Sequence, residues 1–161
     1  MGVHDDPAAG GPGTASPVID PKQEGIAFLL NQAARAIARD LQARLLPYGV
    51  TPPQLSVLSC LWEEDGLPAT VLAERAGFDA PTTTGILDRL ERQELVVRQR
   101  STGDRRVVTA HLTGRGSVLR EALPRIAHES NAAALAGFSP AATRELRAAL
   151  QRIVANLSGR Q

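Results

Sequence analysis

Residues 67–113 decide the fold of this chain, and they read LPATVLAERAGFDAPTTTGILDRLERQELVVRQRSTGDRRVVTAHLT. The segment 69–76 carries apolar residues at the spacing of a short helix. Gly77 follows it, at a place where helices commonly end on a residue with positive φ. Asp79 can then cap the amides of a second helix, whose first turn tolerates Pro81. A glycine that ends one helix, followed by an aspartate that caps the next, predicts a helix-turn-helix.

The second helix of the pair is predicted to be amphipathic. Ile86, Leu87 and Leu90 recur at helical spacing, and Thr83 falls on the same face one turn earlier. The outward side chains are small or polar, namely Thr82, Thr84, Gly85, Asp88, Arg89 and Arg92. Short hydroxyl side chains at a helix N-terminus, followed by arginines, suit insertion into the major groove of DNA. An ordinary surface helix has the same pattern, so this helix alone leaves both interpretations open.

A basic hairpin is predicted after this helix. The runs 95–98 and 107–112 favour β structure, and the tip between them is 101–106; Leu67 is expected to add a short strand beside the hairpin. Between Arg98 and Arg115 there are five arginines and one acid, whereas the whole chain carries a net charge of only +1. A tip arginine fits the narrow minor groove, and a neighbouring aspartate can fix it by a charge-assisted hydrogen bond. A hairpin with incidental charge is the alternative, which the order of the elements disfavours.

Three runs, in this order, closely resemble the MarR family of bacterial winged-helix transcription regulators. They are LAERAG at 72–77, PTTTGILDRLE at 81–91, and GDRR at 103–106, followed by Leu112 and Thr113. The similarity extends over residues 22–157.

The resemblance implies a DNA-binding site on the second helix and the hairpin. Asp104 and Arg106 match a wing motif in which the arginine enters the minor groove and the aspartate orients it. Gly85 departs from the family pattern, because many members carry a basic side chain there. Thr82, Thr84 and Arg89 match recognition-helix positions that face DNA. The complete predicted DNA-binding set is Thr82, Thr84, Arg89, Arg92, Arg98, Asp104, Arg105 and Arg106.

The predicted fold class is mainly α with a small β-hairpin wing: a winged helix-turn-helix core flanked by N- and C-terminal dimerisation helices. Residues 1–21 have the composition of a disordered tail, and 22–161 form one domain in this prediction. Within it, the DNA-binding lobe covers about 51–113 and the dimerisation helices about 22–47 and 114–157. Thr51 opens a helix with a possible capping box, and a helix from Thr113 to about residue 136 should kink at Pro124.

The flanking helices carry more apolar surface than so small a domain needs. The first repeats Ile26, Leu30, Ala33, Ile37, Leu41 and Leu45, and the last, opened by Ser139 and Pro140, repeats Leu146, Leu150, Ile153 and Leu157. Family resemblance implies that these helices interlock into a homodimer with two-fold symmetry. Paired recognition helices about 34 Å apart would then read an inverted-repeat operator.

Composition excludes several other classes of protein. Aromatic residues make up 3% of the chain, so a core of Leu, Val, Ile and Ala is expected. No apolar run approaches the roughly 20 residues of a membrane span, and no secretion signal is evident, so a cytoplasmic location is predicted. No phosphate loop, nucleophile elbow or paired carboxylates suggest an enzyme, and we expect no cofactor. The histidines lack metal-ligand spacing with Cys60, the single cysteine, so no metal site is expected.

The predicted function is sequence-specific regulation of transcription on double-stranded DNA, as a repressor relieved by a small-molecule effector of unknown identity. Family resemblance implies that the effector binds between the dimerisation helices and the winged-helix lobe. Two alternatives stay open. The winged helix could instead bind an acidic protein partner, or Cys60 could make the protein an oxidant-responsive regulator, although such a cysteine more often acts as a small apolar residue.

Replacement of Arg106 by alanine tests the wing motif. If this arginine enters the minor groove, operator binding should weaken by about 1–3 kcal/mol, measured by gel-shift titration. Unchanged affinity would remove Arg106 from the site.

Overall fold

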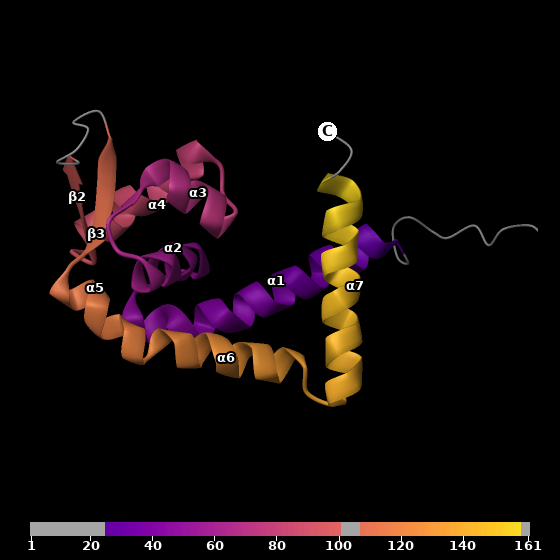
Figure 1. Cartoon of the computed structure of the whole chain (residues 1–161). Helices are drawn as coiled ribbons and strands as arrows, with labels where there is room; N and C mark the ends of the chain where they lie inside the picture. Colours follow the sequence, from indigo (N-terminus) through magenta and orange to yellow (C-terminus); the bar gives the residue numbers. More distant parts are fainter. Residues whose placement is uncertain (1–24, 101–106, 159–161) are drawn as a thin grey trace, which may run out of the picture. The chain divides into compact units, whose positions relative to one another are not determined.

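The computed structural model describes residues 25–100 and 107–158, which form mostly helices and one small sheet (Figure 1). Contacts between residues divide the chain into two compact units, Met1–Arg35 and Ala36–Gln161, with the boundary inside the first helix. The main helices are α1 (Ile26–Leu45), α2 (Pro52–Glu63), α3 (Ala69–Ala76), α4 (Ala80–Arg92), α5 (Gly114–Val118), α6 (Leu123–Ala134) and α7 (Pro140–Ser158). Short 3-10 turns follow α1 (η1, Leu46–Tyr48) and α5 (η2, Leu119–Glu121). The predicted mainly helical fold class is confirmed.

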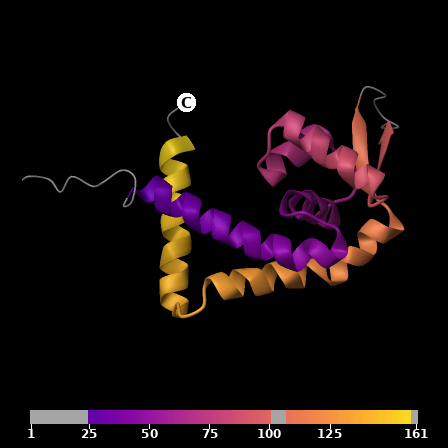
Figure 2. The same ribbon diagram turned by 180° about the vertical axis from the view of Figure 1, so that it is seen from behind.

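The sheet is antiparallel with strand order β1-β3-β2. Strand β2 (Val96–Arg100) and strand β3 (Val108–Leu112) form the predicted hairpin, in a register that pairs Arg98 with Ala110. The predicted short strand at Leu67 is β1 (Leu67–Pro68), which pairs with the other edge of β3. Figures 1 and 2 show α2, α3 and α4 packed together beside this sheet. The described part of the second unit therefore contains a winged helix-turn-helix.

Side-chain caps set the helix starts where the sequence predicts them. Thr51 and Gln54 form a reciprocal capping box at α2, with the Thr51 amide donating to Gln54 Oε1 at 2.9 Å. Thr113 Oγ1 accepts a hydrogen bond from the Gly116 amide at 3.1 Å, and Ser139 Oγ accepts one from Ala142 at the same distance. These local signals were therefore sufficient to place three helix N-termini.

The predicted single helix after Thr113, kinked at Pro124, is wrong. The helical path already changes at Leu119, where α5 gives way to η2, and α6 then begins at Leu123. Pro124 lies in the first turn of α6, where its missing N–H costs no helical hydrogen bond. Proline therefore starts a new helix here and does not bend an existing one.

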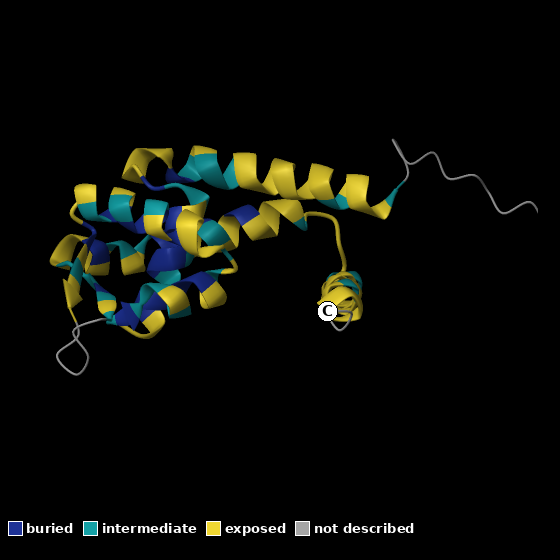
Figure 3. Ribbon diagram, turned by 90° about the horizontal axis from the view of Figure 1, so that it is seen from above, coloured by how far each residue is buried: buried dark blue, intermediate teal, exposed yellow. Residues whose placement is uncertain are grey.

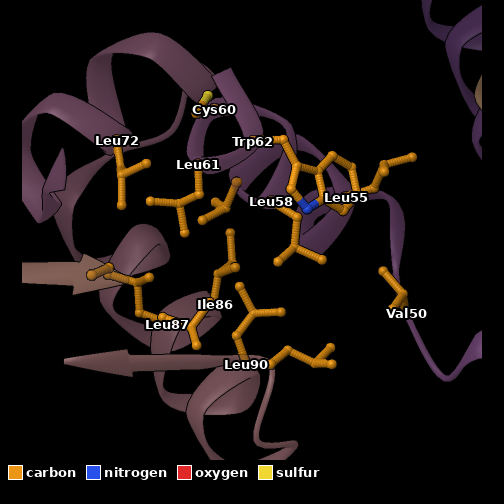
Figure 4. Close-up of a cluster of buried hydrophobic side chains, with 14 of the residues drawn as sticks. Val50, Leu55, Leu58, Cys60, Leu61, Trp62, Leu72, Ile86, Leu87 and Leu90 are labelled. Carbon is orange, nitrogen blue, oxygen red and sulfur yellow. The ribbon is translucent and has the colours of Figure 1, made fainter. Parts of the chain in front are cut away.

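The core is built mainly from aliphatic side chains of α2, α3 and α4 (Figure 4). Leu58, Leu72, Ile86 and Leu90 have no exposed surface. Trp62 is the aromatic member, and its Nε1 donates to the carbonyl oxygen of Gly116 at 3.0 Å. In contrast, α7 contains no buried residue and is yellow and teal in Figure 3.

Replacing Gly116 by alanine should destabilise the protein. An ideal Cβ at this position would lie 2.1 Å from the carbonyl oxygen of Leu95, which is backbone and accepts a hydrogen bond from the Thr113 amide. Overpacking of this kind costs about 1–3 kcal/mol of unfolding free energy. The midpoint of urea denaturation should fall accordingly.

Gly114→Ala is the matched control, because nothing lies within 4 Å of a Cβ built there. Its midpoint should stay the same or rise slightly, since alanine favours helix. An equal loss in both variants would contradict the proposed clash at Gly116.

Candidate nucleic-acid interface

The turn between α3 and α4 orients the second helix. Gly77 ends α3 with a φ of 73°, in the left-handed region that glycine adopts readily. Asp79 Oδ1 then accepts a hydrogen bond from the Thr82 amide at 2.7 Å. Hydrogen bonds from Thr82 hold the pKa of Asp79 below its usual value, so the cap stays ionised at the positive end of the helix.

One face of α4 is buried as predicted. Ile86, Leu87 and Leu90 are at most 1% exposed. Thr83 is also fully buried, and its Oγ1 donates to the carbonyl oxygen of Asp79 at 2.9 Å, which satisfies the hydroxyl inside the core. This face fixes the rotation of α4 about its own axis.

The opposite face exposes four residues of the predicted DNA-binding set: Thr82, Thr84, Arg89 and Arg92. Thr84 Oγ1 donates to the carbonyl oxygen of Ala80 at 2.9 Å, so in this arrangement the hydroxyl can act towards a ligand only as an acceptor. The structure thus brings together, on the exposed surface of one helix, four of the eight side chains that the sequence proposes as contacts.

Arg89 and Arg92 occupy different parts of this face. A Cβ built on Gly85 would lie 3.9 Å from both Nη1 and Nη2 of Arg89, so this guanidinium lies over Gly85, toward the N-terminal half of α4. The Nε atom of Arg92 donates to the carbonyl oxygen of Asp88 at 3.3 Å, in the last turns of the helix. At Gly85, which departs from the family pattern, a Cβ would only be in ordinary van der Waals contact with the Arg89 guanidinium.

Arg98 is held by two carboxylates of α4. Its Nη2 lies 2.5 Å from Asp88 Oδ1 and 2.7 Å from Glu91 Oε2, and its Nε donates to the same Glu91 oxygen at 3.0 Å. Hydrogen bonding to Arg98 holds the pKa of Glu91 below its usual value, and hydrogen bonding to Glu91 raises the pKa of Arg98. Asp88 and Glu91 were not identified as candidate site residues from the sequence, because their partner, Arg98, lies on another element.

The remaining predicted contacts, Asp104, Arg105 and Arg106, lie outside the described residues. The described hairpin closes at the pair Arg100 and Val108, which bounds the segment that contains them. Their contacts with DNA stay predictions.

The described residues give little support to an oxidant-sensing site at Cys60. This side chain is 9% exposed in α2, and burial raises the pKa of its thiol. Because the thiolate is the reactive form, this environment disfavours reaction with oxidants. Over the same described residues, no group of three or more His, Cys, Asp or Glu residues is placed to hold a metal ion. No helix in residues 25–100 or 107–158 is long and apolar enough to cross a membrane.

Comparison with known proteins agrees with this architecture. A family model described as MarR family matches residues 50–108. The organic hydroperoxide resistance transcriptional regulator of Bacillus subtilis (strain 168) is 34% identical over 96 residues, a match that covers 60% of this chain and 65% of that protein. The chain therefore spans just under two thirds of the length of this relative.

Two solved structures resemble the chain over most of its length. A probable transcriptional regulator from Pseudomonas aeruginosa is 32% identical with a TM-score of 0.74, over 80% of this chain and 96% of that one. CouR from Rhodococcus jostii RHA1, solved with p-coumaroyl-CoA bound, is 27% identical with a TM-score of 0.70, over 80% of this chain and 90% of that one. With its helix-turn-helix, its hairpin and these matches, the chain belongs to the MarR family.

Proposed function

We propose that this chain regulates transcription by binding a specific sequence of double-stranded DNA as a homodimer. The observation that carries the proposal is the exposed face of α4, with Thr82, Thr84 and Arg89 presented beside a hairpin rich in arginine. An α-helix fits the major groove, and a basic hairpin next to it can reach the adjacent minor groove or backbone. The relatives are named as transcriptional regulators, which supports the same function. Regulation of this kind needs no enzymatic step.

Different parts of α4 would read different features of DNA. The N-terminal half of a recognition helix contacts base edges. Because the guanidinium of Arg89 lies over Gly85, we propose that it binds a guanine through O6 and N7. For Arg92, near the end of the helix, we propose a contact with a phosphate. We infer that Arg89 contributes specificity and Arg92 contributes affinity.

The homodimer is supported by the apolar side chains of α7. Leu146, Leu150, Val154 and Leu157 are exposed, and no residue of this helix is buried. A second copy of the chain would cover this surface, with the two-fold axis expected of a closed dimer. Two-fold symmetry would place the recognition helices about 34 Å apart and require an inverted repeat.

Regulation would come from a small-molecule effector that relieves repression. Support comes from CouR, a relative that was solved with an acyl-CoA bound. An effector can weaken DNA binding only if it binds more tightly to a dimer whose recognition helices have the wrong spacing. Chromosomal DNA is the target, so we propose that the protein acts in the cytoplasm.

Selection of bound duplexes from a random-sequence library tests the proposal. The wild-type protein should enrich an inverted repeat, and its affinity should fall steeply as salt rises. Arg89→Ala should enrich the same repeat with one base pair in each half-site relaxed, at a cost of about 1–3 kcal/mol.

Arg92→Ala is the matched control on the same helix. It should keep every base preference, bind all sequences more weakly and lower the salt slope by about 1. Wild-type protein that enriches no sequence, or that binds duplex DNA without dependence on salt, would favour a protein-binding role for the winged helix instead.

Replacement of Leu150 by glutamate should separate the dimer. A carboxylate in an apolar interface costs several kcal/mol, roughly enough to exceed the stability of a modest dimer. Light scattering after size exclusion should report a monomer, with operator binding lost. Gln151→Glu adds the same charge on the polar side of α7 and should stay dimeric; a dimeric Leu150→Glu protein would remove α7 from the interface.

A further inference from the structure

Recognition helix α4 and wing strand β2 are joined by an ionic cluster of Asp88, Glu91 and Arg98, here called the clasp. Glu91 uses both carboxylate oxygens: Oε1 accepts from the Arg98 amide at 3.1 Å, and Oε2 accepts from the guanidinium at 2.7 and 3.0 Å. Asp88 Oδ1 accepts a further bond from Nη2. The clasp therefore grips the backbone of β2 as well as its side chain.

The clasp holds the hairpin partway along its length. Arg98 is the third of the five residues of β2, and its partner in the register is Ala110 of β3. At the base of the hairpin, the Thr113 amide donates to the carbonyl oxygen of Leu95. A strand of five residues is about 16 Å long, so a tilt of about 10° at its base would move its far end by about 3 Å. Such a shift is as long as a hydrogen bond.

The charges of the clasp argue against a direct contact between Arg98 and DNA. Two carboxylates surround one guanidinium, and the Arg98 side chain is only 29% exposed. To reach a phosphate, Arg98 would have to leave charge-assisted hydrogen bonds that are already formed. The cluster as a whole carries a formal charge of −1, which by itself repels DNA.

We propose that Arg98 is a positioning residue, which with Glu91 as its anchor sets the wing at a fixed angle to the recognition helix. This inference rests on the proposed DNA-binding function. It replaces the prediction that Arg98 contacts DNA, and it makes an acid on the recognition helix necessary for tight binding.

Glu91→Ala separates positioning from simple charge effects, because the two predict opposite signs. Removal of an acid near DNA should strengthen binding if only charge matters. Loss of the clasp should instead weaken binding to the selected operator by about tenfold, as expected when one groove contact is displaced. Fluorescence anisotropy measures the affinity, and stoichiometric titration gives the folded, active fraction, so that a loss of stability alone leaves the affinity unchanged.

Glu94→Ala is the matched control. Glu94 is also an acid near the end of α4, and it pairs at 2.6 Å with Arg115, outside the clasp. Its removal should leave the affinity unchanged or slightly higher.

Arg98→Lys gives a second test, because it keeps the positive charge while it removes the geometry of the clasp. Lysine lacks the planar guanidinium that can bind two carboxylates at once. The operator affinity of the Arg98→Lys protein should therefore be about as low as that of the Arg98→Ala protein. The double variant Arg98→Ala/Glu91→Ala should cost no more than either single change, because both remove the same interaction. Near wild-type affinity for Arg98→Lys, or tighter binding by Glu91→Ala, would overturn the inference. Failure of the wild type to bind any duplex would instead overturn the proposed function.

Discussion

The recognition helix can present a polar face only because its opposite face is anchored in the core. Ile86, Leu87 and Leu90 are almost completely buried, and each such side chain contributes about 1.5–3 kcal/mol when it leaves water. Thr83 adds a buried hydroxyl whose hydrogen bond stays within the first turn of α4. Because a helix is rigid about its axis, these contacts also fix the direction of every outward side chain. Packing against the core therefore determines the position of α4, and the outward side chains depend on that position.

A chain of amide hydrogen bonds secures the far end of α4. Gln54 is 2% exposed, and its Nε2 donates to Gln93 Oε1 at 2.8 Å while its Oε1 accepts from the Thr51 amide. Gln93 in turn donates to the carbonyl oxygen of Gly49 at 2.8 Å. A buried amide that loses a partner costs about 1–3 kcal/mol, so each of these hydrogen bonds matters for stability. They connect the turn before α2 to the C-terminal end of α4.

The sequence predicted the parts of this fold that depend on neighbouring residues. Gly77 and Asp79 mark the helix-turn-helix because their effects act within one turn of helix. The effect of Pro124 was misjudged, because the helical path already changes at Leu119, upstream of the proline, and α6 begins only at Leu123. The pairing of Arg98 with Asp88 and Glu91 was also not predictable, since the sequence does not show which acids a strand residue will meet once the chain has folded. Two arginines that look equivalent in the sequence, such as Arg92 and Arg98, can therefore have different environments in the folded chain.

The ion pairs also change the meaning of the charge count. Five arginines between residues 98 and 115 suggested a strongly basic hairpin, but Arg98 is paired with two acids and Arg115 with Glu94. The positive potential that DNA would meet must then come mainly from other side chains, among them Arg89 and Arg92 on α4. Ion pairing therefore distinguishes Arg98, which is held by two carboxylates of α4, from Arg89 and Arg92, which are exposed on that helix.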